Sequence, residues 1–454
     1  MVKIGLEIHG YLETKEKLFC SCVSEHGAKF SKPNTNICPI CCGMPGSKPM
    51  LPNSAAIDKS IQIALILNCK INEKLIWQRK HYSWPDLPKG YQNTLSGPHA
   101  FPVGINGKFE GIKITEVHLE EDPAAWNPKT GEIDYNRSGS PLIEIVTEPE
   151  FKSAEQVVEW LITLKSTLSY IKSLDRSSGL KADVNVSIDN GVRVEIKNVN
   201  SISNIKTAIE HELERQARSL PKKQETRAFN ESDGTTTHMR FKEEAEDYRF
   251  ISDPDLPIIK IDAKTIKKLK ENLPETPKEK LNKLIKKYKI PKNSTEVLTK
   301  NLDMVELFEI VSSRISPQLA LNWITVELQR VLNYNKKLLD EVEIIPEHII
   351  ELLELVQNKK ITELKAKEIL NKFVPKSFSP LSEAVKQSTI SDEKEIERLS
   401  GAAIIKNPKA VQDYKNGEEK ALNFLIGQVM RLSNKRADFE IARKILERIL
   451  KNLK

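Results

Sequence analysis

The chain has 454 residues, of which 39% are hydrophobic and 29% are charged. This composition is typical of a soluble globular protein and excludes a largely disordered one. Because a single core stops growing at about 250–300 residues, the length predicts two or three domains. No run approaches the roughly 20 apolar residues of a membrane span, and the N-terminus lacks an apolar signal core. We therefore expect a cytoplasmic protein that does not enter a membrane.

The formal net charge of +7 is unevenly distributed along the chain. Residues 261–454 carry +9, whereas residues 1–260 carry −2. A basic second half favours contact with an acidic polymer. The alternative is that these lysines only solvate helix surfaces, and charge alone favours this alternative.

Residues 1–260 mix short β-like runs with helical periodicity, which predicts an α+β domain. Strands are expected where Val and Ile gather between turn residues, at 103–105, 111–115, 141–147 and 184–188. Helices are expected at 55–67, 153–173 and 203–219.

The second half predicts helices only. Residues 261–294 are rich in lysine and broken by prolines, which indicates a linker or a helical hairpin. A helical domain is expected over 295–391, where prolines separate short helices. A boundary near Ser391 would leave a last helical unit over 392–454.

All six cysteines lie within the first 70 residues. Cys20 and Cys22 form one close pair, Cys38 and Cys41 form another, and fifteen residues separate the pairs. In a reducing cytosol, such pairs favour a metal site over disulfides. Four thiolates suit a tetrahedral, structural Zn²⁺ site, which predicts a zinc-binding insertion near residues 20–42.

Other assignments of the cysteines remain open. Cys42 could replace Cys41, and His26 is a spare ligand within the loop. The set could also be buried free thiols. Cys69 follows an apolar helix and is expected in the core.

Three strand-like runs carry acidic residues. Alternation places Glu7 and His9 on one face of a strand, and Glu144 lies within an apolar strand. Glu120 and Glu121 belong to an HLEED run. A buried Glu is costly unless it is paired or binds a cation, and carboxylate oxygens suit Mg²⁺ with phosphate. The alternatives are an ion pair between Glu144 and Arg137, and a solvated turn at 120–122.

Polar loops surround these runs, and each is either a binding segment or an ordinary loop. A rigid loop with two prolines and a glycine is expected to present Lys89 and Gln92 for recognition. No P-loop or Gly-rich dinucleotide motif is present, so any ATP phosphates are held differently. The candidate substrate- and ATP-binding residues are Lys80, Lys89, Tyr91, Gln92, Asn136, Arg137, Lys197 and Asn198.

Together these motifs resemble the GatB family, the B subunits of tRNA-dependent amidotransferases. The matching runs include GLEIH (5–9), CPICCGMPG (38–46), RKHYSWPDLPKGYQ (79–92), HLEED (118–122), NRSGSPLIEIV (136–146), EIKNVNS (195–201), QETR (224–227) and NPKAVQDYKNGEEKALNFLIGQVM (407–430). They follow the family order over nearly the whole chain. The related GatE subunit is longer, and no room for its inserted domain is apparent.

The resemblance implies a cradle-like α+β catalytic domain, an all-α helical domain and a small helical YqeY-like tail domain that binds tRNA. It also implies ATP-dependent phosphorylation of the side-chain carboxylate of Glu-tRNA(Gln) or Asp-tRNA(Asn), then amidation. Ammonia would come from the glutaminase subunit GatA, with GatC as third subunit, since no amidase signature is found in this chain. The loops resemble those of archaeal members, which leaves the choice of tRNA open.

The same resemblance gives roles to the acidic runs. Glu7, His9 and Glu144 would lie next to Mg²⁺, with Glu120 or Glu121 as a fourth group. His9 could instead act as a general base for ammonia. Two other classes remain as alternatives, a zinc-dependent RNA-binding scaffold and a metal-dependent hydrolase.

The last residues, Arg431–Lys454, carry eight basic and three acidic side chains. Helical spacing would place Arg436, Arg443 and Lys444 near one side, with Arg431 before them. Such a face can follow a phosphate backbone, and the resemblance to the family places tRNA recognition in this tail.

Overall fold

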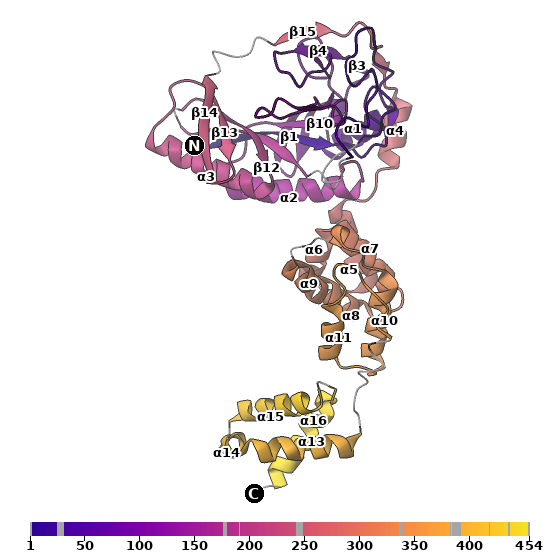
Figure 1. Cartoon of the computed structure of the whole chain (residues 1–454), viewed down its shortest axis with the longest axis vertical. Helices are drawn as coiled ribbons and strands as arrows, with labels where there is room; N and C mark the ends of the chain where they lie inside the picture. The colour runs from indigo at the N-terminus through magenta and orange to yellow at the C-terminus, as the bar shows by residue number, and fades with distance from the viewer. Residues whose placement is uncertain are drawn as a thin grey trace. The chain divides into compact units, whose positions relative to one another are not determined.

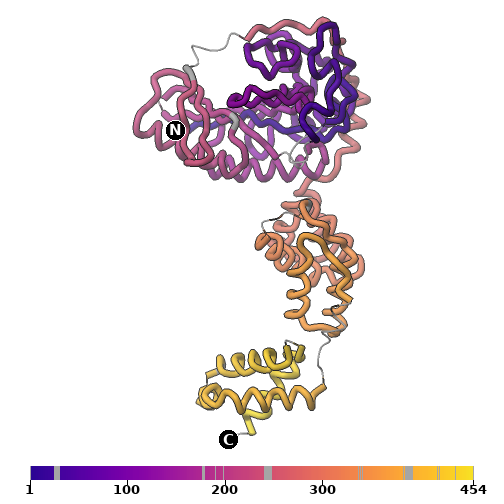
Figure 2. The backbone as a smooth tube through the Cα atoms, viewed as in Figure 1, coloured from indigo at the N-terminus to yellow at the C-terminus, as the bar shows by residue number. Residues whose placement is uncertain are grey.

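The computed structural model describes residues 2–24, 31–175, 179–189, 191–241, 248–335, 337, 339–381, 383, 392–416, 418–434 and 436–452. The chain divides into two compact units, Met1–Pro277 and Lys278–Lys454. The first unit is a mixed sheet with helices. The regular elements described in the second unit are all helices, apart from isolated β-bridge residues. Figure 2 traces this change from extended strands to successive coils.

A 12-stranded sheet forms the centre of the first unit, in the order β14-β13-β12-β11-β1-β10-β7-β5-β4-β15, with β6 and β2 joined to it through β7. Two small sheets pair β16 with β3 and β8 with β9. The strands are β1 (Lys3–Tyr11), β2 (Lys70–Ile71), β3 (Lys74–Leu75), β4 (Gln78–His81), β5 (Gln92–Thr94), β6 (Gly104–Phe109), β7 (Ile112–Glu121), β8 (Ala125–Trp126), β9 (Ile133–Asp134), β10 (Pro141–Thr147), β11 (Lys181–Ser187), β12 (Val194–Asn200), β13 (Glu225–Asn230), β14 (Thr235–Phe241), β15 (Arg249–Ser252) and β16 (Ile259–Lys260).

One face of the sheet is apolar because residues alternate along each strand. On β1, the side chains of Ile4, Leu6 and Ile8 are at most 1% exposed. Helices α2 (Ala154–Tyr170) and α3 (Ile202–Arg218) run along one side of the central strands (Figure 1). Trp160 of α2 packs edge-on against Phe109 and Phe151, with ring centroids 5.6 and 5.4 Å away. The opposite face is therefore left for the polar residues of the same strands.

The helices predicted for the first unit are confirmed. Asn53 caps α1 (Ser54–Ile66), and Ser153 and Ser201 cap α2 and α3 by accepting backbone N–H bonds. The four predicted strands correspond to β6, β7, β10 and β11. Strand β7 continues to Glu121, so the HLEED run is strand rather than a solvated turn up to that residue.

The segment expected as a linker or hairpin is divided between the units. Helix α4 (Ala263–Glu271) packs on α1, and Ile266, Leu269 and Leu273 pack against the core of the first unit. Helix α5 (Pro277–Tyr288) begins at the boundary of the second unit. The sequence left the choice between linker and hairpin open because both helices are rich in lysine and carry only a short stripe of apolar residues.

In the second unit, three prolines expected as boundaries begin helices, namely Pro317, Pro346 and Pro408. Among the described residues, no helix is long and apolar enough to cross a membrane. Helices α13 to α16 share a core of their own, whereas the expected boundary at Ser391 lies outside the described residues. The elements are α6 (Lys292–Thr299), α7 (Leu302–Val311), α8 (Pro317–Asn322), a π-helix (Trp323–Leu328), α9 (Gln329–Tyr334), a 3₁₀ turn (Leu339–Glu341), α10 (Pro346–Gln357), α11 (Glu363–Leu370), α13 (Glu393–Lys406), α14 (Pro408–Lys415), α15 (Glu419–Leu432) and α16 (Phe439–Asn452).

Candidate active site

Three neighbouring strands bring two histidines and a carboxylate into one row. The antiparallel register sets His9 of β1 opposite Glu144 of β10, and Glu144 opposite His118 of β7. The Oε2 atom of Glu144 lies 3.1 Å from Nε2 of His9 and 3.1 Å from Nε2 of His118. The other ring nitrogen of His118, Nδ1, lies 3.1 Å from Oε1 of Glu116. One carboxylate is thus shared by two imidazoles.

The electrostatics of this row follow from burial and mutual pairing. Burial opposes ionisation of Glu144, but the two imidazoles outweigh it and hold the carboxyl pKa well below its usual range. Burial likewise disfavours the imidazolium form of His9, yet Glu144 raises the pKa of His9 to about 9. In the same way, Glu144 raises the pKa of His118 to about 10 against the effect of burial. Both rings are therefore protonated at neutral pH while no cation is bound.

The structure separates the two adjacent glutamates of β7. Glu120 shares the face of His9 and Glu144, and ligand atoms of these three side chains lie within 4.8 Å of one another. Burial and the negative charge of Glu144 raise the pKa of Glu120. Glu121 points to the other side, where its Oε1 accepts a bond from Lys89 Nζ at 2.5 Å. Of the two, only Glu120 joins the group of side chains that could hold a metal ion.

Glu7 belongs to a second acidic group on the same face. Its ligand atoms lie within 4.8 Å of those of Asp183 on β11 and Glu195 on β12. Lys197 Nζ reaches Asp183 Oδ2 at 2.7 Å and Glu195 Oε1 at 3.4 Å. Burial, followed by Glu144 and Asp183, raises the pKa of Glu7. The expected trio of Glu7, His9 and Glu144 is therefore divided between two neighbouring groups.

Three residues of this face, His118, Asp183 and Glu195, are not among the candidates predicted from the sequence. Each stands between apolar residues of a strand, in VHL, ADV and VEI runs. The signal that singles out Glu144, a charged or polar side chain within an apolar strand, would also have found Asp183 and Glu195.

The ion pair between Glu144 and Arg137, the alternative to a functional role for Glu144, is not formed. Arg137 Nε lies 3.1 Å from Asp122 Oδ2, and its guanidinium donates to the carbonyls of Pro123 and Ala124. Asn136 is fully buried and bonds the backbone of the cysteine loop, at the Asn36 N–H and the Lys32 carbonyl. Both residues hold the loop between β9 and β10 in place.

Lys89 and Gln92 face inwards rather than outwards from their loop. Gln92 is 6% exposed, and its amide donates to the Glu121 carbonyl at 3.0 Å. Tyr91 stacks against Arg79, whose guanidinium carbon lies 4.3 Å from the ring centre. The Pro and Gly turns of this loop close it onto the sheet, so its donors meet protein acceptors. Their roles in binding stay predictions.

Two lysines lie near the polar face. Lys80 Nζ lies 4.8 Å from the ring centre of Tyr248 and forms no ion pair within the described chain. Lys80 also lowers the pKa of Glu120, against the larger effect of burial. Lys197 is held by the second acidic group, which raises its pKa despite burial. The side chain of Asn198 lies outside the described residues.

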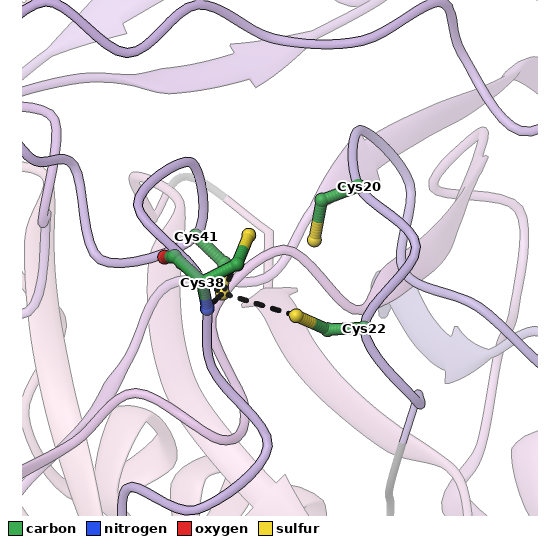
Figure 3. A group of neighbouring side chains, drawn as sticks. All are labelled: Cys20, Cys22, Cys38 and Cys41. Atoms are coloured by element: carbon green, nitrogen blue, oxygen red, sulfur yellow. Dashed lines mark hydrogen bonds between the residues drawn. The ribbon is translucent and has the colours of Figure 1, made fainter.

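The four predicted cysteines converge. Ligand atoms of Cys20, Cys22, Cys38 and Cys41 lie within 4.8 Å of one another, and the two pairs face each other from separate loops (Figure 3). Cys41 Sγ is 3.9 Å from the sulfurs of Cys22 and Cys38. Four thiolates at about 2.3 Å from a tetrahedral Zn²⁺ would be about 3.8 Å apart, so this set fits zinc.

The cysteine alternatives are partly resolved. Cys42 is absent from the group that Cys41 joins, and His26 lies outside the described residues. Cys69 is buried in the main core, as predicted. A hydrogen bond from Cys20 lowers the pKa of Cys41 to about 4, which favours a thiolate at this position.

Comparison with known proteins places these features in one family. Residues 2–267 match the GatB/GatE catalytic domain, and residues 306–450 match the GatB domain. The chain is 45% identical to the aspartyl/glutamyl-tRNA(Asn/Gln) amidotransferase B subunit of Methanocaldococcus jannaschii, over 96% of this chain and 95% of that protein. Identity to the proteins of the same name is 44% in Methanothermobacter thermautotrophicus, over 97% and 98%, and 40% in Methanopyrus kandleri, over 98% of both.

The pair between Lys89 and Glu121 is expected to support the fold. Their side chains are 11% and 7% exposed, so Lys89→Met should destabilise the first unit by roughly 3 kcal/mol by leaving a buried carboxylate unpaired. Adding Glu121→Gln should recover most of that loss. Urea denaturation measures both, with Lys113→Met as control because its partner Glu150 is more exposed. Equal, small shifts in Lys89→Met and Lys113→Met would show that the pair does not stabilise the fold.

Proposed function

The chain belongs to the GatB family of tRNA-dependent amidotransferase B subunits, and on that basis we propose that the polar face of its sheet is the amidation site. The reaction converts misacylated Glu-tRNA(Gln) or Asp-tRNA(Asn) into Gln-tRNA(Gln) or Asn-tRNA(Asn). The row of His9, Glu144 and His118, with Glu120 beside it, is the observation that carries this proposal. Buried groups with strongly shifted pKa values are typical of catalytic sites.

The chemistry requires activation of a carboxylate. The side-chain carboxylate of the aminoacyl group is a poor electrophile, so its oxygen attacks the γ-phosphorus of ATP and ADP leaves. Ammonia then attacks the carbonyl carbon of the resulting acyl phosphate, the bond to phosphate breaks, and inorganic phosphate departs. The ammonium proton lost in this step needs an acceptor. Charge neutralisation and alignment are the main tasks of the site.

Magnesium fits the residues of this face. His9, Glu120 and Glu144 would hold one Mg²⁺, and the separation of 3.1 Å between His9 Nε2 and Glu144 Oε2 matches the edge of about 3.0 Å of an octahedron with bonds of about 2.1 Å. When bound, Mg²⁺ supplies neutralisation of phosphate charge. Glu7, with Asp183 and Glu195, would add a second group of carboxylates on the same face of the sheet. Burial and neighbouring carboxylates raise the pKa values of Glu7 and Glu120, so a bound cation would stabilise the ionised form of both side chains.

The lysines supply the remaining positive charge. Lys80, which has no carboxylate partner among the described residues, would hold an ATP phosphate. Lys197 stays protonated between its two carboxylates and would orient them or a phosphate, together with Asn198. A general-base role for His9 is less well supported, because Glu144 raises its pKa and keeps the ring protonated at neutral pH.

The four-cysteine group would hold one structural Zn²⁺. All four ligands come from the protein, which leaves no open position for substrate.

Ammonia would come from GatA, with GatC completing a cytoplasmic heterotrimer. ATP turnover that depends on misacylated tRNA distinguishes this function from an RNA-binding scaffold or a metal-dependent hydrolase, because neither would couple the two.

Replacing single carboxylates tests the site. Glu144→Gln and Glu7→Gln keep the side-chain size but remove charge, and each should lower kcat for amidation by at least about 100-fold. Binding of tRNA should stay unchanged because other surfaces provide it. Glu148→Gln, just beyond the end of β10, is the matched control. Near-normal amidation by both site variants would refute the assignment.

The tail is the proposed tRNA-binding part. Arg443 and Lys444 are exposed on α16, and Arg431 is exposed near the end of α15. The predicted helical spacing of Arg436 with Arg443 is wrong, because α16 begins only at Phe439 and Arg436 lies in the connection before it. The proposal therefore rests on the exposed positive charge rather than on a helical stripe.

Neutralising these four cations to glutamine tests the tail. The variant should bind tRNA more weakly, and each lost phosphate contact should flatten the slope of log K against log salt by about 0.7–0.9. Removing residues after Ser391 should have a similar effect while leaving partner association intact. Binding isotherms of the complex at two salt concentrations decide this, with Lys394→Gln and Lys406→Gln on α13 as controls. Superimposable curves for all variants would exclude the tail from tRNA binding.

A further inference from the structure

Lys17 is a buried cation without a carboxylate partner among the described residues. Its residue is 1% exposed, and its Nζ donates to the carbonyls of Asn36 and Tyr135 at 3.1 Å each. Transfer of an ammonium group from water into a protein interior is costly unless negative charge compensates it. Two carbonyl dipoles satisfy hydrogen bonds but supply no net charge.

The four-cysteine group, a source of negative charge when its thiols are ionised, lies next to Lys17. Lys17 lies beside Cys41: a Cβ placed on Gly139 would contact the side chains of both, at 3.7 and 3.8 Å. The backbone ties them as well, since the Lys17 N–H donates to the Cys22 carbonyl at 2.9 Å. The carbonyl of Asn36 that Lys17 binds is two residues before Cys38. Lys17 therefore contacts the segments that carry both cysteine pairs, by its backbone on one side and by its ammonium group on the other.

We propose that Lys17 is the counter-charge of the four-cysteine centre, a positioning residue that stabilises its zinc-loaded state. This inference rests on the proposed zinc site. Four thiolates around Zn²⁺ carry a net charge of −2, and a buried anion of this kind requires a cation close by. The ammonium group of Lys17 halves that net charge while its bond to Asn36 anchors the loop that presents Cys38 and Cys41.

A purely mechanical role makes a different prediction. An anchor needs only N–H donors for the two carbonyls, so a neutral amide would serve. A counter-charge needs the positive charge, so an amide would not. Lys17→Arg keeps charge and donors, Lys17→Gln keeps donors alone, and Lys17→Met keeps neither. Lys15→Gln is the matched control, because Lys15 is an exposed lysine of the same segment.

The experiment measures zinc in the full-length protein. Zinc content is determined first, and the rate of Zn²⁺ transfer to a chromophoric chelator is then followed for each variant. Lys17→Gln and Lys17→Met should both release zinc at least about tenfold faster than the unsubstituted chain. Lys17→Arg and Lys15→Gln should resemble the unsubstituted chain. Circular dichroism establishes that each variant is folded.

A second comparison keeps the inference falsifiable if Lys17→Met does not fold. Cys22→His gives a three-thiolate, one-imidazole set, which binds Zn²⁺ with one negative charge fewer. Lys17→Gln should then accelerate zinc release less in the Cys22→His background than in the original chain, as a coupled pair requires. Equal acceleration in both backgrounds would overturn the counter-charge.

The zinc measurements also separate the role of Lys17 from the zinc site itself. If Lys17→Gln releases zinc as slowly as Lys17→Arg, Lys17 is an anchor only and the inference is wrong. If the unsubstituted chain neither contains nor takes up zinc, the proposed zinc site itself fails. If zinc is present and all Lys17 variants hold it equally, the zinc site stands and the role of Lys17 falls.

Discussion

A single buried carboxylate, shared by two histidines, is the constraint on which the candidate site depends. Glu144 can be buried and ionised only because His9 and His118 face it from the strands on either side. That arrangement requires the register of three antiparallel strands, since a slip of one residue would turn each side chain to the other face. The apolar residues between them, packed on α2 and α3, fix that register. Core packing and the geometry of the candidate site are therefore set by the same alternation.

The cysteine group is mechanically joined to this site by short backbone links. Ser138 donates to the Cys41 carbonyl at 2.8 Å, and the Leu18 N–H donates to the Gly139 carbonyl at 2.7 Å. Gly139 in turn donates to Asp122, which directly follows β7 and its Glu120. A metal that holds the two cysteine loops together would thus also fix the backbone at Gly139 and Asp122, next to the acidic residues.

Alternation within one strand is readable from the sequence, but pairing between strands is not. The pattern around Glu7 and His9 places both on one face, and the spacing of Cys20, Cys22, Cys38 and Cys41 predicts their convergence. The sequence does not distinguish Glu120 from Glu121, because the two are adjacent carboxylates in one acidic run and their faces are set by pairing with β10 and β5. The inward orientation of Gln92 likewise depends on an acceptor 29 residues away. Such contacts arise only when distant segments meet.

The central claim is that His9 and Glu144 together form a cation site, and proton release on magnesium binding tests it most directly. In the metal-free protein Glu144 raises the pKa of His9 to about 9, so a cation that takes the His9 nitrogen at about pH 8 must displace its proton. Titration calorimetry in buffers of different ionisation enthalpy should show at least roughly one proton released per Mg²⁺. His9→Asn should lower this release by about one proton, since only His118 then remains paired with Glu144, and His99→Asn should retain it in full. Magnesium binding without proton release, or equal release by both variants, would contradict the account.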